Sequence, residues 1–141
     1  MCGIFGILKT NSLNGNKFPI DAVISTLSHR GPDSQGAWAD YKNKVVLGHT
    51  RLAVQDLSEA ASQPFISASG RSVIVFNGEI YNHLKLRKLV PNITWKTRSD
   101  TETLVELAEF LGPEKAATML HGMFAFAIWD QQTCDLTLLR D

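Results

Sequence analysis

The cysteine at position 2 is the first residue of this sequence whose type and place could do chemistry. Removal of an initiator methionine is favoured by a small second residue, and it would leave Cys2 with a free α-amino group. An α-amine titrates at about 7.7–8.0 and a free thiol at about 8.5. One residue would then supply both a nucleophilic thiol and its general base. The alternative is an ordinary buried thiol, since free cysteine is often found in cores.

Asn77 and Gly78 are candidates for the groups that would stabilise a reacting amide. A thiolate that attacks an amide needs hydrogen-bond donors where negative charge develops. The two residues follow a β-branched apolar run and offer a side-chain amide and a backbone N–H. Glycine also allows the backbone to turn and to approach a ligand closely. The alternative is a plain hairpin turn, which is a common use of Asn-Gly.

Three charged residues could recognise an amino acid, which needs a cation for its carboxylate and an anion for its ammonium group. Arg51 stands at the end of a predicted strand and can hold a carboxylate through two parallel hydrogen bonds. Glu79 and Asp100 are the anions predicted to face the ammonium group. Taken singly, Arg51 could be a surface charge and Asp100 an acidic residue favoured by a helix N-terminus.

The remaining cysteine and the histidines show no metal-binding pattern. Neither HExxH nor CxxC occurs, and no two of the histidines have metal-ligand spacing. We therefore expect no metal site, and we interpret the four histidines, His29, His49, His83 and His121, as structural or surface residues. Cys134 has no companion cysteine and is also interpreted as structural.

The elements that must position these groups alternate between strands and helices. Apolar and β-branched runs predict a strand buried on both faces at 2–8 and further strands at 36–40, 44–54, 71–78, 122–130 and 134–141. The last two are expected to be adjacent and buried. Apolar periodicity predicts helices at 20–27, 83–90, 99–112 and 113–120, and polar composition predicts loops at 9–19 and 56–70. This alternation predicts an α/β layered domain.

The helix at 99–112 has the clearest signals. Ser99 and Glu102 fit a capping box at its start, and Gly112 fits a C-cap at its end. An apolar stripe would face the core through Leu104, Leu107, Ala108 and Leu111.

Composition limits the class of protein. The chain of 141 residues fits one domain, and its 44% apolar content is that of a globular protein. It has 14 basic and 14 acidic residues, so its net charge of zero gives no electrostatic case for binding nucleic acid or an anionic membrane. No apolar segment approaches the ~20 residues that span a bilayer, and the N-terminus has no signal-peptide pattern. We expect a cytoplasmic protein.

Six motifs then occur in order along essentially the whole chain: MCGIFGI, HRGPDSQG, GHTRLAVQDLS with a later QP, FNGEIYNH, SDTETL, and GMFAFAIWD with a later LLRD. Together they resemble the class II glutamine amidotransferase domain of glutamine-hydrolysing asparagine synthetases. Glucosamine-6-phosphate synthases typically have HTRWATHG where this chain has HTRLAVQD, and amidophosphoribosyltransferases usually have HRGQ where it has HRGP. The asparagine synthetase group therefore fits best.

The resemblance implies an α/β (α+β) fold of the N-terminal-nucleophile hydrolase type, with four layers αββα and two antiparallel sheets. It implies hydrolysis of glutamine to glutamate and ammonia through a thioester on Cys2, with the α-amine of Cys2 as base and with Asn77 and the Gly78 N–H as oxyanion hole. It also implies a glutamine pocket formed by Arg51, Leu52, Val54, Asn77, Gly78, Glu79 and Asp100.

Two parts of the family pattern are missing. The sequence stops after LLRD, before a KPLYY-like strand, and it lacks the SGGxDS-type loop of the synthetase half. We therefore expect residues 1–141 to be a glutaminase domain truncated at its C-terminal end. We expect this domain to need no cofactor, since ATP and Mg²⁺ would serve only the synthetase half. The expected partners are glutamine and a covalently linked or separate synthetase domain, and a homodimer is left open.

Other functions compete with this interpretation. The ammonia could feed another acceptor, such as a carboxylated sugar or a peptide, because the missing half chooses the acceptor. A cysteine hydrolase of other amides is a further option, although it would not need the paired charges of Arg51 and Asp100. A catalytically silent binding module with the same fold is the alternative outside enzymes.

Overall fold

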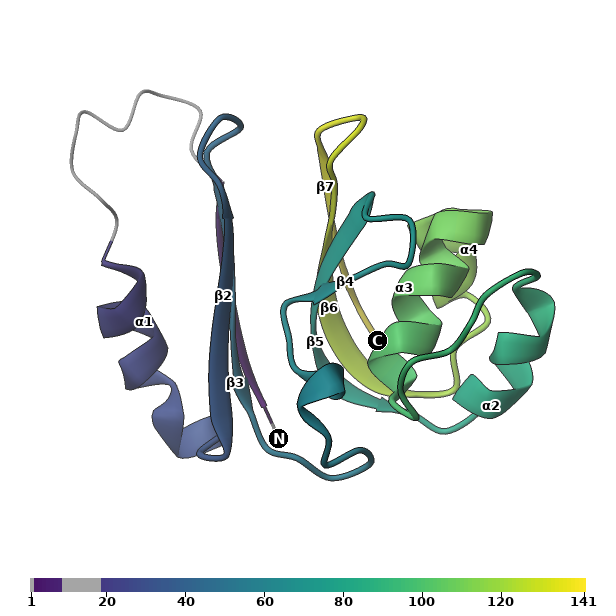
Figure 1. The fold of residues 1–141 in the computed structure, drawn as a ribbon, viewed down its shortest axis with the longest axis horizontal. Helices are drawn as coiled ribbons and strands as arrows, with labels where there is room; N and C mark the ends of the chain where they lie inside the picture. Colours follow the sequence, from purple (N-terminus) through teal and green to yellow (C-terminus); the bar gives the residue numbers. More distant parts are fainter. Residues whose placement is uncertain (1, 9–18) are drawn as a thin grey trace.

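The computed structural model describes residues 2–8 and 19–141 and arranges them in four layers, with two antiparallel sheets between two layers of helices (Figure 1). The predicted αββα architecture is therefore confirmed. The predicted loop at 9–19 lies outside the described residues except for Pro19.

Sheet A has the strand order β1-β3-β2, and α1 covers its outer face (Figure 1). Its strands are β1 (Gly3–Leu8), β2 (Ser34–Asp40) and β3 (Val45–Arg51); α1 spans Ile20–Thr26 and is followed by the 3₁₀ turn η1 (Ser28–Arg30). The central β3 is buried along its whole length. The prediction that the first strand is buried on both faces is wrong, because β1 is an edge strand and its Leu8 is 51% exposed.

Sheet B has the order β4-β5-β6-β7, and the helices α2, α3 and α4 pack on its outer face (Figure 1). Its strands are β4 (Phe65–Ile66), β5 (Ser72–Ile80), β6 (Gly122–Asp130) and β7 (Asp135–Arg140). The helices are α2 (His83–Leu86), α3 (Asp100–Leu111) and α4 (Pro113–Ala117), with 3₁₀ turns η2 (Glu59–Ala61) and η3 (Arg87–Leu89). β7 is adjacent to β6 as predicted, but as an edge strand it is not buried, and Leu138 is 68% exposed.

β5 continues through the Asn-Gly pair, where the sequence suggested a turn. All nine residues from Ser72 to Ile80 pair with β6. Glycine is required inside this strand, since a Cβ on Gly78 would lie 2.3 Å from the Met123 carbonyl oxygen. The alternative of a hairpin turn at Asn77–Gly78 is therefore wrong, because a long partner strand holds these residues extended, and the strand predicted at 71–78 continues to Ile80.

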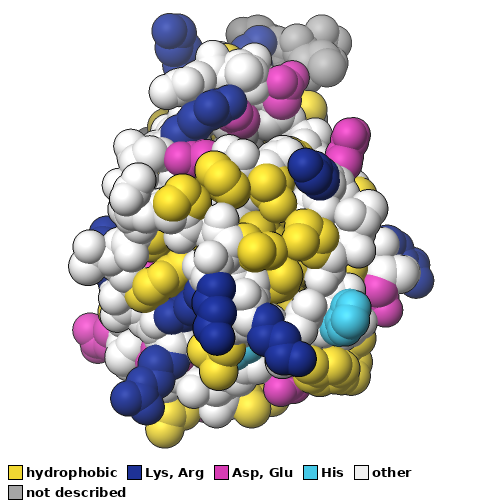
Figure 2. All heavy atoms as spheres, turned by 90° about the vertical axis from the view of Figure 1, so that its right-hand side faces the viewer, with side chains coloured by type: hydrophobic (Ala, Val, Ile, Leu, Met, Phe, Trp, Pro, Cys, Tyr) yellow, Lys and Arg dark blue, Asp and Glu magenta, His cyan; other side chains and the backbone are white. Residues whose placement is uncertain are grey.

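Two apolar cores hold the layers together. The core between the sheets contains the buried residues Val45, Leu47, Val73, Val75, Ala127 and Trp129. The larger core lies between sheet B and its helices and includes Leu104, Leu107 and Ala108 of the predicted stripe. Figure 2 shows the outer face of this helical layer, where apolar side chains gather with Lys and Arg side chains around them. The exposed apolar residues of the helical elements are Leu84, Leu89 and Phe110.

The start of α3 confirms part of the predicted capping box. The Ser99 side chain accepts a hydrogen bond from the Glu102 N–H at 3.2 Å, as an N-cap should. The Glu102 carboxylate does not return this bond to Ser99. It accepts the N–H groups of Lys96 and Thr97, both at 2.8 Å, because the chain folds back over the helix end. Gly112, with φ of 89°, is the C-cap as predicted.

Among the described residues, the longest helix has twelve residues, and no helix is long and apolar enough to cross a membrane.

Candidate active site

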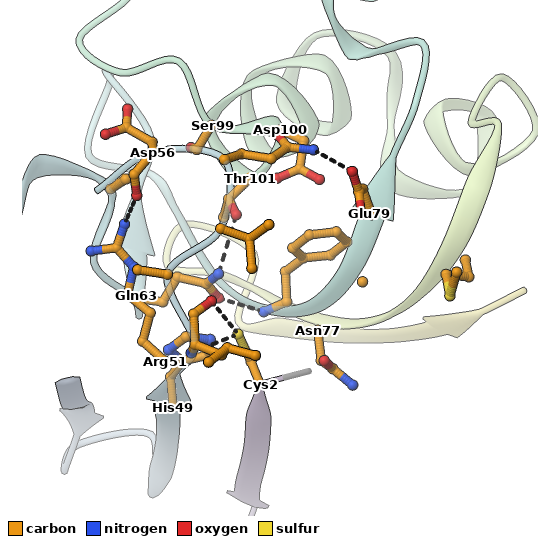
Figure 3. Close-up of a pocket in the computed structure, with 18 residues that line it drawn as sticks. Cys2, His49, Arg51, Asp56, Gln63, Asn77, Glu79, Ser99, Asp100 and Thr101 are labelled. Atoms are coloured by element: carbon orange, nitrogen blue, oxygen red, sulfur yellow. Dashed lines mark hydrogen bonds between the residues drawn. The ribbon is translucent and has the colours of Figure 1, made fainter. Parts of the chain in front are cut away.

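A cavity of about 270 Å³ opens where the ends of the two sheets meet the start of α3 (Figure 3). All eight residues predicted for the site contribute to its wall: Cys2, Arg51, Leu52, Val54, Asn77, Gly78, Glu79 and Asp100. These residues come from four widely separated parts of the sequence. The fold therefore brings the whole predicted set together.

Cys2 lies at the start of β1, half-buried, with its thiol on the cavity wall. Its Sγ accepts a hydrogen bond from the Leu52 N–H at 3.4 Å. The strand behind it is fixed, since the Gly3 N–H donates to Thr50 Oγ1 at 3.1 Å and Thr50 donates in turn to the Leu27 carbonyl. The Arg30 Nε donates to the carbonyl of Cys2 itself at 3.0 Å. The thiol thus has a defined position at the open edge of sheet A.

The Gly78 N–H points to the cavity edge of β5. The neighbouring even positions show the direction: the Phe76 N–H donates to Gln63 Oε1 at 2.6 Å, and the Ile80 N–H donates to Asp100 Oδ2 at 2.9 Å. N–H groups two residues apart on a strand point the same way. The Gly78 N–H therefore lies between these two, away from β6. This is the orientation that an oxyanion donor at this position needs.

The Asn77 side chain projects from the face of sheet B that is turned towards sheet A. Val73 and Val75, at other odd positions of β5, lie on this face and fill the core between the sheets. Its Oδ1 is buried and has no hydrogen-bond partner. A buried acceptor without a partner is costly, so this oxygen is available to accept a hydrogen bond from a ligand. An oxyanion would instead need the Nδ2 donor of the same amide.

Arg51 ends β3 and is only 9% exposed. Its Nη1 donates to the Ser58 carbonyl at 2.9 Å and to Ser62 Oγ at 3.5 Å, and its Nη2 donates to the Asp56 carbonyl. These bonds use part of the guanidinium group to hold the following loop, and they leave Nε and one Nη2 hydrogen for a ligand. Arg51 is therefore a fixed cation in the wall rather than a mobile surface charge.

Asp100 and Glu79 form the anionic side of the cavity (Figure 3). Burial raises the pKa of Asp100 above its usual value, hydrogen bonds from backbone N–H groups oppose this, and the charge of Glu79 raises it further. A buried carboxylate beside another carboxylate is stabilised by a cation. The ammonium group of an amino acid is such a cation, and it would lie across the cavity from Arg51.

His49 is a wall residue that the sequence interpretation treated as only structural. It is 1% exposed, lies two residues before Arg51 on β3, and its Nε2 has no hydrogen-bond partner. Burial, with a smaller effect of Arg51, lowers its pKa to about 4, although a hydrogen bond with the Phe76 backbone opposes the shift. His49 is therefore neutral at physiological pH.

Two other wall residues lie within the motifs GHTRLAVQDLS and QP, although no role in the site was predicted for them. Gln63 accepts the Phe76 N–H and donates to Thr101 Oγ1 at 3.1 Å, so it joins β5 to α3. Asp56 joins the loop after β3 to the residues before α3. Both lie in a polar stretch that is predicted as a loop, and only the contacts between distant segments show their importance.

Over residues 2–8 and 19–141, no group of three or more His, Cys, Asp or Glu side chains is placed to hold a metal ion. Cys2 and Cys134 are both free thiols, and Cys134 is exposed in the turn between β6 and β7.

The fold and the place of the thiol define a class of protein. Two antiparallel sheets between helical layers, with a cysteine at the second position on the edge of one sheet, form an N-terminal-nucleophile hydrolase fold. In agreement, the structure of the glutamine phosphoribosylpyrophosphate amidotransferase of Bacillus subtilis, in complex with ADP and GMP, matches 73% of this chain and 25% of that chain with a TM-score of 0.56 at 24% identity.

Comparison with protein families is more specific. Residues 1–141 match the family model described as "Glutamine amidotransferase domain". A probable glutamine-hydrolysing asparagine synthetase of Schizosaccharomyces pombe is 38% identical over the whole chain, and asparagine synthetase B of Escherichia coli is 35% identical. A protein of Gibberella zeae named amidase chry2 is 32% identical. The chain spans about a quarter of the length of these relatives: 25%, 25% and 22%.

This chain belongs to the glutamine amidotransferase domain family. Its curated relatives include several glutamine-hydrolysing asparagine synthetases, which is the group that the sequence motifs resemble.

Proposed function

We propose that this domain hydrolyses glutamine to glutamate and ammonia through a thioester on Cys2. The observation that carries the proposal is the common cavity, whose wall contains the Cys2 thiol, the fixed cation Arg51 and the anions Glu79 and Asp100. A free amino acid with a side-chain amide matches this set, because its carboxylate, ammonium group and reactive carbonyl each have a partner.

The reaction has two halves. The α-amine of Cys2 takes the thiol proton, and sulfur forms a bond to the side-chain carbonyl carbon of glutamine. The Asn77 side chain and the Gly78 N–H stabilise the resulting oxyanion. The α-ammonium group returns its proton to the leaving nitrogen, and the carbon–nitrogen bond breaks to release ammonia. Water then attacks the thioester, the amine accepts its proton, and the carbon–sulfur bond breaks to give glutamate and the thiol.

We further propose that the ammonia serves ATP-dependent asparagine synthesis from aspartate in the intact protein. The support is the identity to the asparagine synthetases over the whole domain. ATP and Mg²⁺ would bind in a synthetase domain, linked or separate, and this domain would work without a cofactor. A cytoplasmic location belongs to the same proposal.

A different acceptor for the ammonia is the second candidate. The protein named amidase chry2 is 32% identical over the whole chain, almost as similar as several synthetases. Similarity in this domain alone therefore does not select the acceptor, which the rest of the protein would determine.

Mass spectrometry of the purified protein tests glutamine hydrolysis directly. The protein is incubated with and without 6-diazo-5-oxo-norleucine, a reactive mimic of glutamine. We expect Met1 to be absent and one adduct to form on Cys2, with none on Cys134. Retention of Met1, or failure of Cys2 to react, would instead favour the silent binding module.

A further inference from the structure

Asp56 links two segments of the chain by hydrogen bonds. One segment follows the cation Arg51 of the candidate site, and the other precedes the anion Asp100. We call residues 52–62, which follow Arg51, the substrate loop, and residues 96–99, which precede Asp100, the helix-entry segment. Asp56 Oδ1 accepts the Ser58 N–H at 2.9 Å within the loop, and Oδ2 accepts the Arg98 N–H at 2.7 Å across 42 residues. Its carbonyl oxygen accepts from Arg51 Nη2. One residue thus contacts both the cation and the segment that leads to the anion.

The helix-entry segment is a rigid anchor for this contact. Glu102 accepts the N–H groups of Lys96 and Thr97, both at 2.8 Å. The Arg87 guanidinium donates to the carbonyls of Thr97 and Ser99, both at 2.9 Å. The Arg98 N–H points out of the helix-entry segment, and Asp56 Oδ2 accepts its hydrogen bond. The loop is therefore attached to a backbone that is already fixed.

The other hydrogen bonds of the substrate loop lie near its start. The Leu52 N–H donates to Cys2 Sγ at 3.4 Å, the Ala53 N–H donates to Asp33 Oδ2 at 2.8 Å, and Gln55 Nε2 donates to Glu79 Oε1 at 3.2 Å. Apolar packing holds the end of the loop, where Ala61 is 4% exposed, but not its middle, where Val54 is 69% and Leu57 78% exposed. Polar bonds from Asp56 and Arg51 must then supply most of the order in the middle of the loop. Hydrogen bonds from Ser58, first from its side chain, and from the Arg98 N–H lower the pKa of Asp56 to about 2, so these donors meet a full negative charge.

We propose that Asp56 is a positioning residue that sets the distance between Arg51 and Asp100, and that it thereby selects a substrate with both an α-carboxylate and an α-ammonium group. The proposal rests on the proposed function, since it concerns how the same cavity binds glutamine. Asp56 itself does not touch the reacting atoms. It acts through Arg51, whose guanidinium it holds by a carbonyl, and through the helix-entry segment, which it holds by a carboxylate.

The test is the kinetics of glutamine hydrolysis by the Asp56→Ala variant of the full chain. Two charge-assisted hydrogen bonds are lost, so KM for glutamine should rise roughly 10-fold or more, while kcat changes less than about threefold because Cys2 and the oxyanion donors are untouched. Asp56→Asn, which keeps one oxygen acceptor, should recover part of the lost affinity. The matched control is Asp135→Ala, an exposed aspartate on β7, which should leave KM unchanged.

A double-mutant cycle separates positioning from a general loss of structure. If Asp56 acts through Arg51, then Asp56→Ala should raise KM much less in an Arg51→Ala background than in the wild type. Backbone hydrogen exchange gives a readout without activity, since the amides of Ser58 and Arg98 should exchange faster in Asp56→Ala.

An unchanged KM, or effects of the two substitutions that simply multiply, would overturn the proposal while glutamine hydrolysis by the wild type stands. If the wild type neither hydrolyses glutamine nor reacts with the diazo mimic, the proposed function fails instead. Hydrogen exchange still decides the positioning in that case, because unchanged protection of Ser58 and Arg98 would refute it.

Discussion

At the scale of single residues, the site separates the reacting atom from the groups that select the substrate. Cys2 contacts Leu52 through its sulfur, while the hydrogen bonds that fix its backbone come from Arg30 and, through Gly3, from Thr50. The strand would therefore keep its place without the thiol. Removal of the sulfur should change chemistry and little else.

We predict that Cys2→Ala abolishes glutamate release, with at least a ~10³-fold loss of rate, because no other nucleophile stands at this position. Thermal unfolding should change by only a few degrees, since the side chain is half-buried and small. Glutamate release is measured by a coupled assay. Cys134→Ala, at the exposed thiol, is the control and should keep wild-type activity.

His49 gives a prediction about pH. Burial lowers its pKa to about 4 in the folded state against 6.5 for a free side chain, so the unfolded chain takes up the proton first. Stability should therefore fall as the pH drops from about 6.5 to 4, by up to ~3 kcal/mol for this group. Asp56 and Asp130 have a pKa lowered to about 2, so their protonation changes the stability only below this pH range.

Urea unfolding at pH 7, 6, 5 and 4.5 measures the effect of His49. The acid loss should be smaller in His49→Gln, and the exposed His121→Gln should keep the wild-type slope. Parallel curves for the wild type and His49→Gln would show that His49 is not buried in its neutral form.

At the scale of elements, the candidate oxyanion donor exists because β4 is short. β4 pairs with β5 only at Val73 and Ile74, so the same edge of β5 is open from Phe76 to Ile80. Gln63 and Asp100 use the outer two of the three outward N–H groups. The middle one, on Gly78, faces the cavity. A longer β4 would pair this N–H and remove the donor.

Gly78→Ala tests this arrangement. The added Cβ would lie 2.3 Å from the Met123 carbonyl oxygen and 2.7 Å from the Phe124 Cα, so β5 and β6 must separate at this point. We expect a loss of about 1–3 kcal/mol in stability and a fall of ~10²-fold in kcat as the N–H moves. Gly6→Ala in β1 is the matched control, because the atom nearest to its Cβ would be the Leu47 Cδ2 at 3.3 Å, and the Val46 carbonyl oxygen would lie at an ordinary 3.7 Å. Wild-type kcat in a folded Gly78→Ala protein would remove this N–H from the mechanism.

The sequence predicted which helices and strands form more accurately than it predicted how deeply each of them is buried. Hydrophobic period and caps indicated α3 and most of the strands, because these signals lie within one element, whereas the two sheets were expected only from the family resemblance. Burial of β1 and β7 was overestimated, since an apolar run does not show whether a strand is at an edge. The Asn-Gly pair ends the strand predicted at 71–78 and has a local preference for a turn, which the pairing with β6 overrides.

Chemistry alone nominated Cys2, Asn77, Gly78 and the three charged residues as candidates, and the motifs that resemble a known family joined them into one site. Composition and spacing do not show that Arg51 and Asp100 share a cavity. Asp56 and Gln63 lie within two of these motifs, but their roles in holding the site were not predicted, because their partners lie 42 and 38 positions away.

At the scale of the whole molecule, the candidate site straddles two sheets. Cys2, His49 and Arg51 come from sheet A, whereas Asn77 and Gly78 come from sheet B. The distance between thiol and oxyanion donors therefore depends on the core between the sheets. The helical core on the far side of sheet B supports only one half of the site directly.

A matched pair of substitutions tests whether the core between the sheets sets the geometry of the site. Leu47 and Leu107 are both 0% exposed. Leu47 lies on β3, in the core between the sheets and two residues before His49, whereas Leu107 belongs to α3 and lies in the core between sheet B and its helices. Each Leu→Ala change should cost about 2–5 kcal/mol in stability, because a buried side chain leaves a cavity. At a temperature where both variants stay folded, we expect Leu47→Ala to lose several times more kcat for glutamine hydrolysis than Leu107→Ala. Relaxation around the Leu47 cavity would shift sheet A against sheet B, whereas relaxation around the Leu107 cavity would move α3 against the outer face of sheet B. Equal losses of kcat at equal losses of stability would mean that the sheets hold their spacing without this core, and that contacts at the cavity rim set the position of Cys2.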